Sequence, residues 1–164
     1  MLLIKKGQEP PSLTEYRKQK YATYDGCNKE PIRENLLAEQ GYLCAYCMKR
    51  ISKDNMKIEH WKPEAILTEA QKLDYSNMLG VCEGHIEGED GRYDTCDSKK
   101  KSTLITVDPT REDHINLIKY RKENGEIYSD DKSINNDLNV TLNLNCKKQY
   151  LPQNRKSVLN RVLK

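Results

Sequence analysis

The spacing of four cysteines constrains this chain more than any other feature. Cys44 and Cys47 flank two residues in "GYLCAYCMKRI", the spacing with which a turn commonly offers two thiolates to a tetrahedral zinc ion. Cys82 and Cys96 form the natural second pair, because an exposed loop of thirteen residues can bulge between two ligands at little entropic cost. Cys82 with His85 is the alternative pair, but then Cys96, which directly precedes "DSKKK", would not be a metal ligand. We therefore expect a structural zinc ion on the four cysteines.

Composition explains why a metal would matter to this fold. The chain has 164 residues, of which 32% are charged, and it contains no phenylalanine. This length fits one compact domain, and so polar a composition predicts a modest apolar core. A bound metal would stabilise such a core.

The N-terminus bears on where the protein works. The segment "MLLIKKGQEPP" has only a short apolar run before two lysines, which is too short for a signal segment, and no later stretch approaches a membrane span. We therefore expect a cytoplasmic protein without membrane contact.

In a reducing compartment, closely spaced cysteines bind metals more often than they form disulfides. Cys27 and Cys146 have no spaced partner, and we expect them to be buried or unreactive thiols.

Charge is segregated along the chain although the net charge is only +3. Residues 138–164 contain six basic and no acidic residues, whereas residues 83–95 contain five acidic residues against Arg92 alone. A basic end suggests a phosphate-bearing or acidic partner, and a solvated surface is an equally good reading.

Local signals in the first third of the chain predict helices. Ser12 and Glu15 have the spacing of a capping box, which marks a helix start. A second helix should begin at Pro31, which suits the first helical position, and end at Gly41, which suits a C-terminal cap.

The middle of the chain shows the alternation of polar and apolar residues that is typical of strands. Residues 48–61 alternate polar and apolar side chains around a turn at 53–55, which predicts a hairpin with His60 at the end of its second strand. The glycine- and acid-rich residues 83–95 should form an exposed loop, and a short helix should open at Cys96.

The last third of the chain predicts a hairpin and then helices. Two strand-like runs meet at Asn124 and Gly125, which is a strong hairpin signal. Apolar residues at helical spacing follow from Leu138 onward. The pattern is unbroken at Lys164, which is compatible with a longer native chain.

The zinc tetrad would bring three chemically useful side chains together. Cys47 leads to the strand that ends in Glu59 and His60, and Cys96 leads to the helix that begins with Asp97. Two carboxylates can hold a divalent cation through oxygen, and a neutral imidazole can take a proton from water. A surface histidine is the alternative for His60, but its place after an acidic residue and between zinc ligands favours a site.

At this point the chain resembles the HNH endonucleases with a ββα-metal site, through "CAYC", "IEHWKP", "DYSNML", "VC" and "TCDSKK" in that order. The resemblance implies that Glu59 is a metal ligand, His60 the general base, Asn77 the central asparagine that steadies the loop carrying the base, and Asp97 the second metal ligand. Family members usually carry asparagine or histidine at the position of Asp97, a departure that concerns metal preference more than the site itself.

A closer resemblance covers nearly the whole chain. The segments "KKGQEPPSL", "EQGYLCAYC", "IEHW", "CDSKK", "DPTRE", "NGEIYS" and "LNLN...LPQNR" are similar to the HNH subunit of Septu-type and retron-associated anti-phage systems. This resemblance implies a nucleic-acid target and a partner ATPase subunit of ABC type. For a retron it also implies a reverse transcriptase and its nucleic-acid product.

Together these observations predict an α+β fold with a zinc-stabilised ββα-metal HNH core. Residues 1–40 should form an N-terminal leader and helices, residues 41–106 the nuclease core, and residues 107–164 a C-terminal hairpin and helical extension. The expected activity is hydrolysis of phosphodiester bonds in DNA or RNA, with Mg²⁺ or Mn²⁺ as the catalytic ion and 5′-phosphate products.

Smaller expectations accompany this reading. Lys99, Lys100 and Lys101 lie close to the predicted helix start and could contact phosphates, although a lysine run is usually a solvated face. Tyr46 and Trp61 could stack on bases, but packing is favoured for both. The alternatives from other classes are a non-catalytic zinc-ribbon module that binds nucleic acid or protein, and an adaptor for an ATPase.

Overall fold

The computed structural model describes residues 1–162 of the chain, and the helical pattern expected to reach Lys164 lies in part outside them. Short helices surround two small antiparallel sheets, so the fold is α+β as predicted. In chain order the elements are α1 (Pro11–Arg17), α2 (Glu30–Glu39), β1 (Met56–His60), η1 (Glu64–Ile66), α3 (Glu69–Lys72), η2 (Tyr75–Asn77), β2 (Met78–Cys82), η3 (Gly91–Tyr93), α4 (Cys96–Lys100), α5 (Glu112–Ile115), β3 (Ile118–Tyr120), β4 (Ile127–Ser129), α6 (Lys132–Asn136), the π-helical turn η4 (Asp137–Thr141) and α7 (Leu151–Val162).

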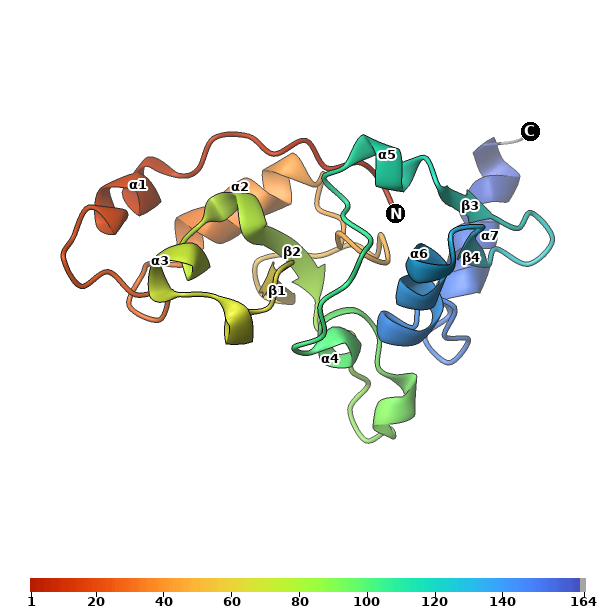
Figure 1. Ribbon diagram of the computed structural model, residues 1–164. Helices are drawn as coiled ribbons and strands as arrows, with labels where there is room; N and C mark the ends of the chain where they lie inside the picture. The colour runs from red at the N-terminus through yellow and green to blue at the C-terminus, as the bar shows by residue number, and fades with distance from the viewer. Residues whose placement is uncertain (163–164) are drawn as a thin grey trace.

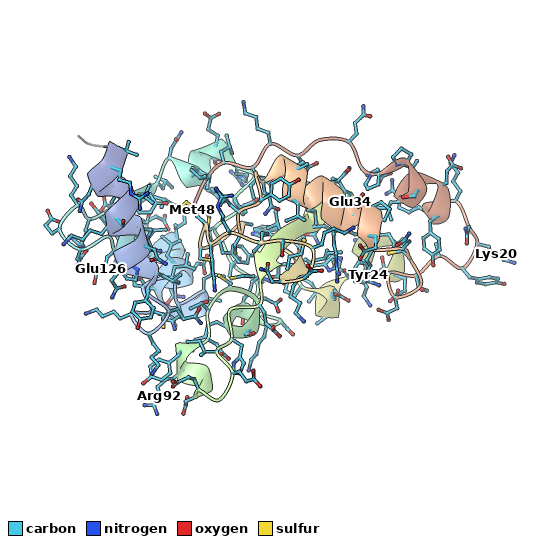
Figure 2. All side chains as sticks on the ribbon, turned by 180° about the vertical axis from the view of Figure 1, so that it is seen from behind. Lys20, Tyr24, Glu34, Met48, Arg92 and Glu126 are labelled. Atoms are coloured by element: carbon cyan, nitrogen blue, oxygen red, sulfur yellow. The ribbon has the colours of Figure 1, made fainter. Side chains whose placement is uncertain are left out.

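The molecule is elongated, with the β1–β2 sheet near its middle (Figure 1). Helices α1 and α3 lie toward one end, and β3, β4, α6 and α7 gather at the other. The view from behind shows Lys20 and Glu126 at these two ends and Arg92 at the tip of a projecting loop (Figure 2). This loop is the acidic segment 83–95, so its predicted exposure is confirmed.

The central sheet pairs β1 with β2, in a register that sets His60 opposite Met78 and Met56 opposite Cys82. The hairpin predicted for residues 48–61 is therefore wrong. The chain after the Cys44–Cys47 turn folds back on the residues before it, with an isolated bridge between Leu43 and Arg50. This leaves β1 free to pair with a more distant and fully buried strand.

Strand β2 is covered from two sides. Helices α2 and α4 both pack against it. At its outer edge, Gln40 accepts a hydrogen bond from the Gly80 amide and donates one to the Gly80 carbonyl, each at 2.7 Å. The amide of Ala45 donates to the same carbonyl at 3.0 Å. The sheet therefore joins the end of α2 to the cysteine turn, and no unpaired strand edge is left at Gly80.

The predicted helix ends are partly confirmed. Helix α2 has Pro31 in its first turn, and Gly41 follows it with φ of 60°, a backbone conformation that favours glycine. The capping box predicted at Ser12 is absent from the described chain, because α1 begins one residue earlier at Pro11 and Pro10 precedes it. A capping box forms instead at Thr68.

The C-terminal hairpin predicted across Gly125 is confirmed by the pairing of β3 with β4. Gly125 has φ of 76°, and a Cβ added there would lie 2.1 Å from the carbonyl oxygen of Pro152. Helix α7 thus packs directly on the turn. Buried Arg155 fixes this contact by donating hydrogen bonds to the carbonyls of Gly125 and Leu144, both at 2.8 Å.

One cluster of buried side chains draws on all three predicted ranges, 1–40, 41–106 and 107–164. The first residues reach across to the last range, where the Ile4 amide donates to the Pro109 carbonyl at 2.8 Å. Cys27 and Cys146 are buried, as predicted for the two cysteines without a spaced partner. Within residues 1–162, no helix has both the length and the apolar character needed to cross a bilayer.

Candidate functional site

The four cysteines predicted to bind zinc come together in one buried cluster. The sulfur atoms of Cys44, Cys47, Cys82 and Cys96 all lie within 4.8 Å of one another. Cys44 and Cys96 are 3.8 Å apart, and Cys47 and Cys82 are 3.6 Å apart. Four sulfurs at tetrahedral zinc bond lengths would be about 3.8 Å apart. The cluster therefore has the dimensions and donor set of a structural zinc site.

The backbone holds these sulfurs from three separate segments. In the first turn, Met48 has φ of 64° and donates from its amide to the Cys44 carbonyl at 3.0 Å. The Lys49 amide points at the Cys47 sulfur, 3.5 Å away. Cys82 ends β2 and Cys96 begins α4. The cluster thus fastens the start of α4 to the end of β2.

Hydrogen bonds between the thiols shift the pKa values within the cluster in opposite directions. Burial alone would raise the pKa of the Cys44 thiol, but hydrogen bonds from the other three thiols hold it well below its usual value. Sharing hydrogen bonds with Cys44 raises the pKa of Cys82 and of Cys96. His85 lies outside the cluster and its Nδ1 is 2.8 Å from Asp94. The structure thus favours Cys96 over His85 as the fourth ligand.

His60 ends β1 with its ring held in one orientation. Its Nε2 is 2.7 Å from the Lys72 carbonyl, which can only accept, so Nε2 carries the proton of the neutral ring. The ring of Tyr24 meets it edge-on at 4.6 Å between centroids. Nδ1 has no hydrogen-bond partner among the described residues, although Glu64 Oε1 is 3.2 Å away. In that tautomer Nδ1 carries the lone pair of the ring and lies on the side of Glu64.

Asn77 pins the chain that follows His60. Its side chain accepts from the Lys62 amide at 2.8 Å and donates to the Lys62 carbonyl at 3.1 Å. Its own carbonyl accepts from the Trp61 amide at 2.9 Å. These three bonds tie the residues after β1 to the residue before β2, so the position of His60 is fixed from both strands.

Glu59 is buried beside His60 and is bound on one oxygen. The ammonium of Lys100 lies 2.5 Å from Glu59 Oε1, and the hydroxyl of Tyr46 donates to the same oxygen at 3.3 Å. Burial raises the pKa of Glu59, Lys100 opposes the rise and nearby Asp97 adds to it, with a net value of about 7. Burial also raises the pKa of Asp97. A hydrogen bond between the Glu59 and Asp97 side chains also contributes to both shifts, so the two carboxylates lie side by side.

These side chains line one open cleft of about 480 Å³, which we call the His60 cleft. Its polar wall includes Glu59, His60, Glu64, Asp94, Asp97 and Lys101. Four carboxylates and one imidazole converge on it, with strand β1 on one side and the start of α4 on the other. Such a wall can bind a cation through oxygen and accept a proton from a water molecule.

The three lysines near the start of α4 differ in position. Lys100 is fully buried at 0% exposed, so the prediction that it contacts phosphate is wrong for this structure. Lys99 is half-buried and Lys101 is exposed on the His60 cleft. Tyr46 is also fully buried, and the Trp61 ring nitrogen donates to the Val107 carbonyl at 2.8 Å, so packing is confirmed for both aromatic residues.

Sequence reasoning missed three contributors to this site, namely Lys100 as a partner of Glu59, and Glu64 and Asp94 as walls of the His60 cleft. Lys100 lies three residues after Asp97 on α4, and Glu64 lies four residues after His60. Asp97 and Lys100 lie on one face of α4, so helical phase was the available signal for Lys100. His60 ends β1 and Glu64 begins η1, so no helical phase relates these two.

We expect Lys100→Met to destabilise the protein far more than Lys99→Met. The first variant leaves the buried Glu59 carboxylate without its cation, a change that costs about 3–5 kcal/mol for buried pairs. The second removes a half-buried charge and should cost no more than about 0.5 kcal/mol. Urea unfolding of both variants measures the difference. Equal unfolding midpoints would show that the Lys100–Glu59 pair does not support the fold.

Comparison with known proteins gives one informative relative. No family model matches the chain. A protein of Vibrio cholerae serotype O1 biovar El Tor, named as the candidate HNH endonuclease of retron Vc95, is 37% identical over 84 residues. The aligned part is 50% of this chain and 39% of the relative. The chain is thus homologous, over half its length, to part of a longer protein that carries the name of an HNH endonuclease.

Proposed function

We propose that this protein is a metal-dependent HNH endonuclease that hydrolyses phosphodiester bonds of DNA or RNA. The observation that carries the proposal is His60, whose ring is oriented by the Lys72 carbonyl and which lines one cleft together with Glu59, Glu64 and Asp97. The partial homologue with an HNH name supports the same class. Strands β1 and β2 and helix α4 then correspond to the ββα-metal unit, and the four cysteines to its structural zinc.

The proposed chemistry uses His60 as the general base. Nδ1 takes a proton from a water molecule placed in line with the scissile phosphorus, and the Lys72 carbonyl keeps the ring from turning. The imidazolium that results is stabilised by Glu64, whose Oε1 is 3.2 Å from Nδ1. Asn77 keeps the loop after His60 in place during this step.

Glu59 and Asp97 fit a divalent cation as oxygen donors. Lys100 and Tyr46 both bind Oε1 of Glu59, and a cation held between Glu59 and Asp97 would replace the hydrogen bond that joins their side chains. A bound Mg²⁺ or Mn²⁺ would supply stabilisation of the charge that develops on the phosphate and on the departing 3′-oxygen. Cleavage of the bond between the phosphorus and the 3′-oxygen leaves 5′-phosphate ends.

Asp97 variants test the metal site. Asp97→Asn keeps an oxygen donor and the residue type more usual in the family, so it should retain part of the activity with a shifted metal optimum. Asp97→Ala should need far more metal or be inactive. Cleavage rates measured against Mg²⁺ and Mn²⁺ concentration distinguish the two. Equal cleavage rates for wild type and Asp97→Ala at limiting metal would show that Asp97 is not a ligand of the catalytic ion.

We also propose that the protein works with an ATPase subunit of ABC type, and in a retron with a reverse transcriptase and its nucleic-acid product. The family resemblance and the basic C-terminal range support this assignment. Helix α7 also exposes two apolar side chains one turn apart, Val158 at 57% and Val162 at 75%. Exposed apolar residues on one helix face suit a protein partner better than a phosphate backbone.

The double variant Val158→Glu with Val162→Glu should lose the ATPase during co-purification, because charges replace the apolar contact. Leu104→Glu is the matched control, since Leu104 is 57% exposed elsewhere on the molecule. The yield of ATPase recovered with each tagged variant is the measurement. Full recovery with the double variant would place the docking surface elsewhere.

A further inference from the structure

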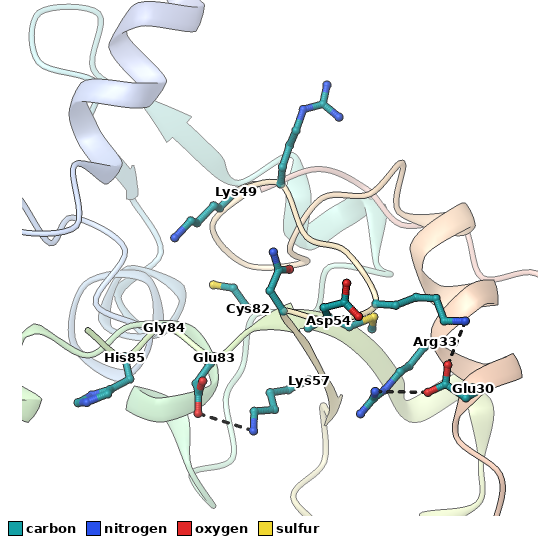
Figure 3. Close-up of a pocket in the computed structure, with 13 residues that line it drawn as sticks. Glu30, Arg33, Lys49, Asp54, Lys57, Cys82, Glu83, Gly84 and His85 are labelled. Atoms are coloured by element: carbon teal, nitrogen blue, oxygen red, sulfur yellow. Dashed lines mark hydrogen bonds and ion pairs between the residues drawn. The ribbon is translucent and has the colours of Figure 1, made fainter. Parts of the chain in front are cut away.

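A second hollow, of about 790 Å³, lies at the other end of β1 from His60 (Figure 3). We call it the basic groove. Its cationic side chains are Arg33, Lys49, Arg50, Lys53 and Lys57, and its acidic ones are Glu30, Asp54 and Glu83. Figure 3 shows Arg33, Lys49 and Lys57 reaching the hollow from different segments. Positive charge from α2, from the cysteine turn and from β1 therefore converges on one surface.

Two cations of the basic groove are available for an external anion, whereas Arg33 and Lys53 pair with Glu30. Lys49 and Arg50 are exposed, and neither pairs with a carboxylate within residues 1–162. Lys57 has a loose pair with Glu83 at 3.6 Å, and both side chains are at least half exposed. Exposed pairs of this kind contribute at most about 1 kcal/mol, so a phosphate can compete for them.

The basic groove and the His60 cleft are lined by consecutive residues of β1, Lys57 in the groove and Ile58 in the cleft. Lys57 and Glu59 are two residues apart on this strand, so their side chains leave the same face about 7 Å apart. On the facing side, the Ser98 amide donates to the Glu83 carbonyl at 2.9 Å, which holds Glu83 next to the start of α4. A chain lying in the groove thus passes Lys57 and enters the cleft at Asp97.

The composition of the groove favours a nucleic-acid backbone over a protein segment. Met56 and Cys82 are the only apolar residues among the thirteen that line it, and both are buried. Protein interfaces usually have an apolar centre, whereas phosphodiester backbones are bound by dispersed cations and polar groups. Resting on the proposed nuclease function, we propose that the basic groove binds the substrate backbone on one side of the scissile bond, with Lys49 and Arg50 as its main phosphate contacts.

The test compares two double variants of the full chain with the same change in net charge. Lys49→Glu with Arg50→Glu removes the groove contacts, and Lys122→Glu with Lys132→Glu is the control on exposed lysines of the C-terminal range. Both are made in a His60→Ala background, so that the probes remain intact. Fluorescence anisotropy measures binding of oligo-dT, oligo-U and duplex DNA of about 20 nucleotides at several salt concentrations. Zinc content confirms that each variant is folded.

We expect the groove variant to bind at least one probe ten-fold or more weakly than the control. Its salt dependence, as the slope of log K against log salt, should be smaller by about 1.4–1.8, because two phosphate contacts are lost. Equal binding by the two double variants overturns the proposal. Normal probe binding with loss of the protein partner also overturns it, because the occupant would then be an acidic protein segment.

The nuclease function is judged separately by another readout. The wild-type protein should hydrolyse bis(p-nitrophenyl) phosphate with Mg²⁺ or Mn²⁺, a probe too small to reach from the His60 cleft into the basic groove. Absence of any hydrolysis would count against the proposed function, while the binding comparison would still decide whether the groove holds a nucleic-acid backbone.

Discussion

His60→Ala is expected to lower cleavage about a hundred- to ten-thousand-fold, the range in which a positioned general base contributes to rate. The reason is that His60 is the proposed proton acceptor and that alanine has no group that can take a proton from water. Rates of cleavage at saturating metal, with wild type and variant side by side, are the measurement.

The variant should otherwise keep its structure. The lost ring contact with Tyr24 and the lost bond to Lys72 should cost the fold about 1–3 kcal/mol. Zinc content and nucleic-acid binding should be retained, because the four sulfurs and the basic groove do not involve the imidazole. His114→Ala is the matched control, since His114 accepts a bond from the Asp108 amide away from the His60 cleft. A fully active His60→Ala would contradict the role of His60 as general base and would favour the alternative of a non-catalytic binding module.

Cys96→Ser is expected to remove zinc and with it most of the folded protein. Structural zinc contributes about 10–16 kcal/mol of binding free energy in small zinc domains, which is of the size of a whole domain's stability. Cys96 also joins α4 to β2, so its loss releases the helix that carries Asp97 and Lys100. Elemental analysis and thermal unfolding, with and without a chelator, measure both effects.

Two controls make this experiment specific. Cys146→Ser places the same change at a buried cysteine outside the cluster and should keep zinc. His85→Ala should also keep zinc, because His85 pairs with Asp94 instead of joining the sulfurs. Normal zinc in Cys96→Ser together with loss in His85→Ala would reverse the choice of the fourth ligand.

The parts of this structure that were predictable from sequence are those with strict local chemistry. A CxxC turn, a proline at a helix start and an Asn-Gly turn each permit few backbone arrangements, and the structure has all three at Cys44, Pro31 and Gly125. The four sulfurs could be grouped because zinc accepts a fixed number of ligands of a few types.

The features that the sequence did not predict are the pairing of the strands and the burial of one lysine. Both depend on contacts between residues that are distant in the chain. Alternation marked residues 56–60 as a strand but could not show that its partner is β2, about twenty residues later, instead of the preceding segment. The lysine run could not show which ammonium turns inward until Glu59 was placed beside α4. Pairing partners and buried charges are set by tertiary packing, which local patterns do not encode.

We propose above all that the His60 cleft is a metal-dependent nuclease site. It is tested most directly by incubating zinc-loaded wild-type protein and His60→Ala, alone and with the co-expressed ATPase, with labelled DNA and RNA in Mg²⁺ or Mn²⁺. We expect cleavage with 5′-phosphate ends by wild type, no cleavage in excess chelator for the divalent ion, and a loss of at least a hundred-fold in the variant. Cleavage at equal rates by both proteins, or binding without cleavage by wild type under all these conditions, would contradict it.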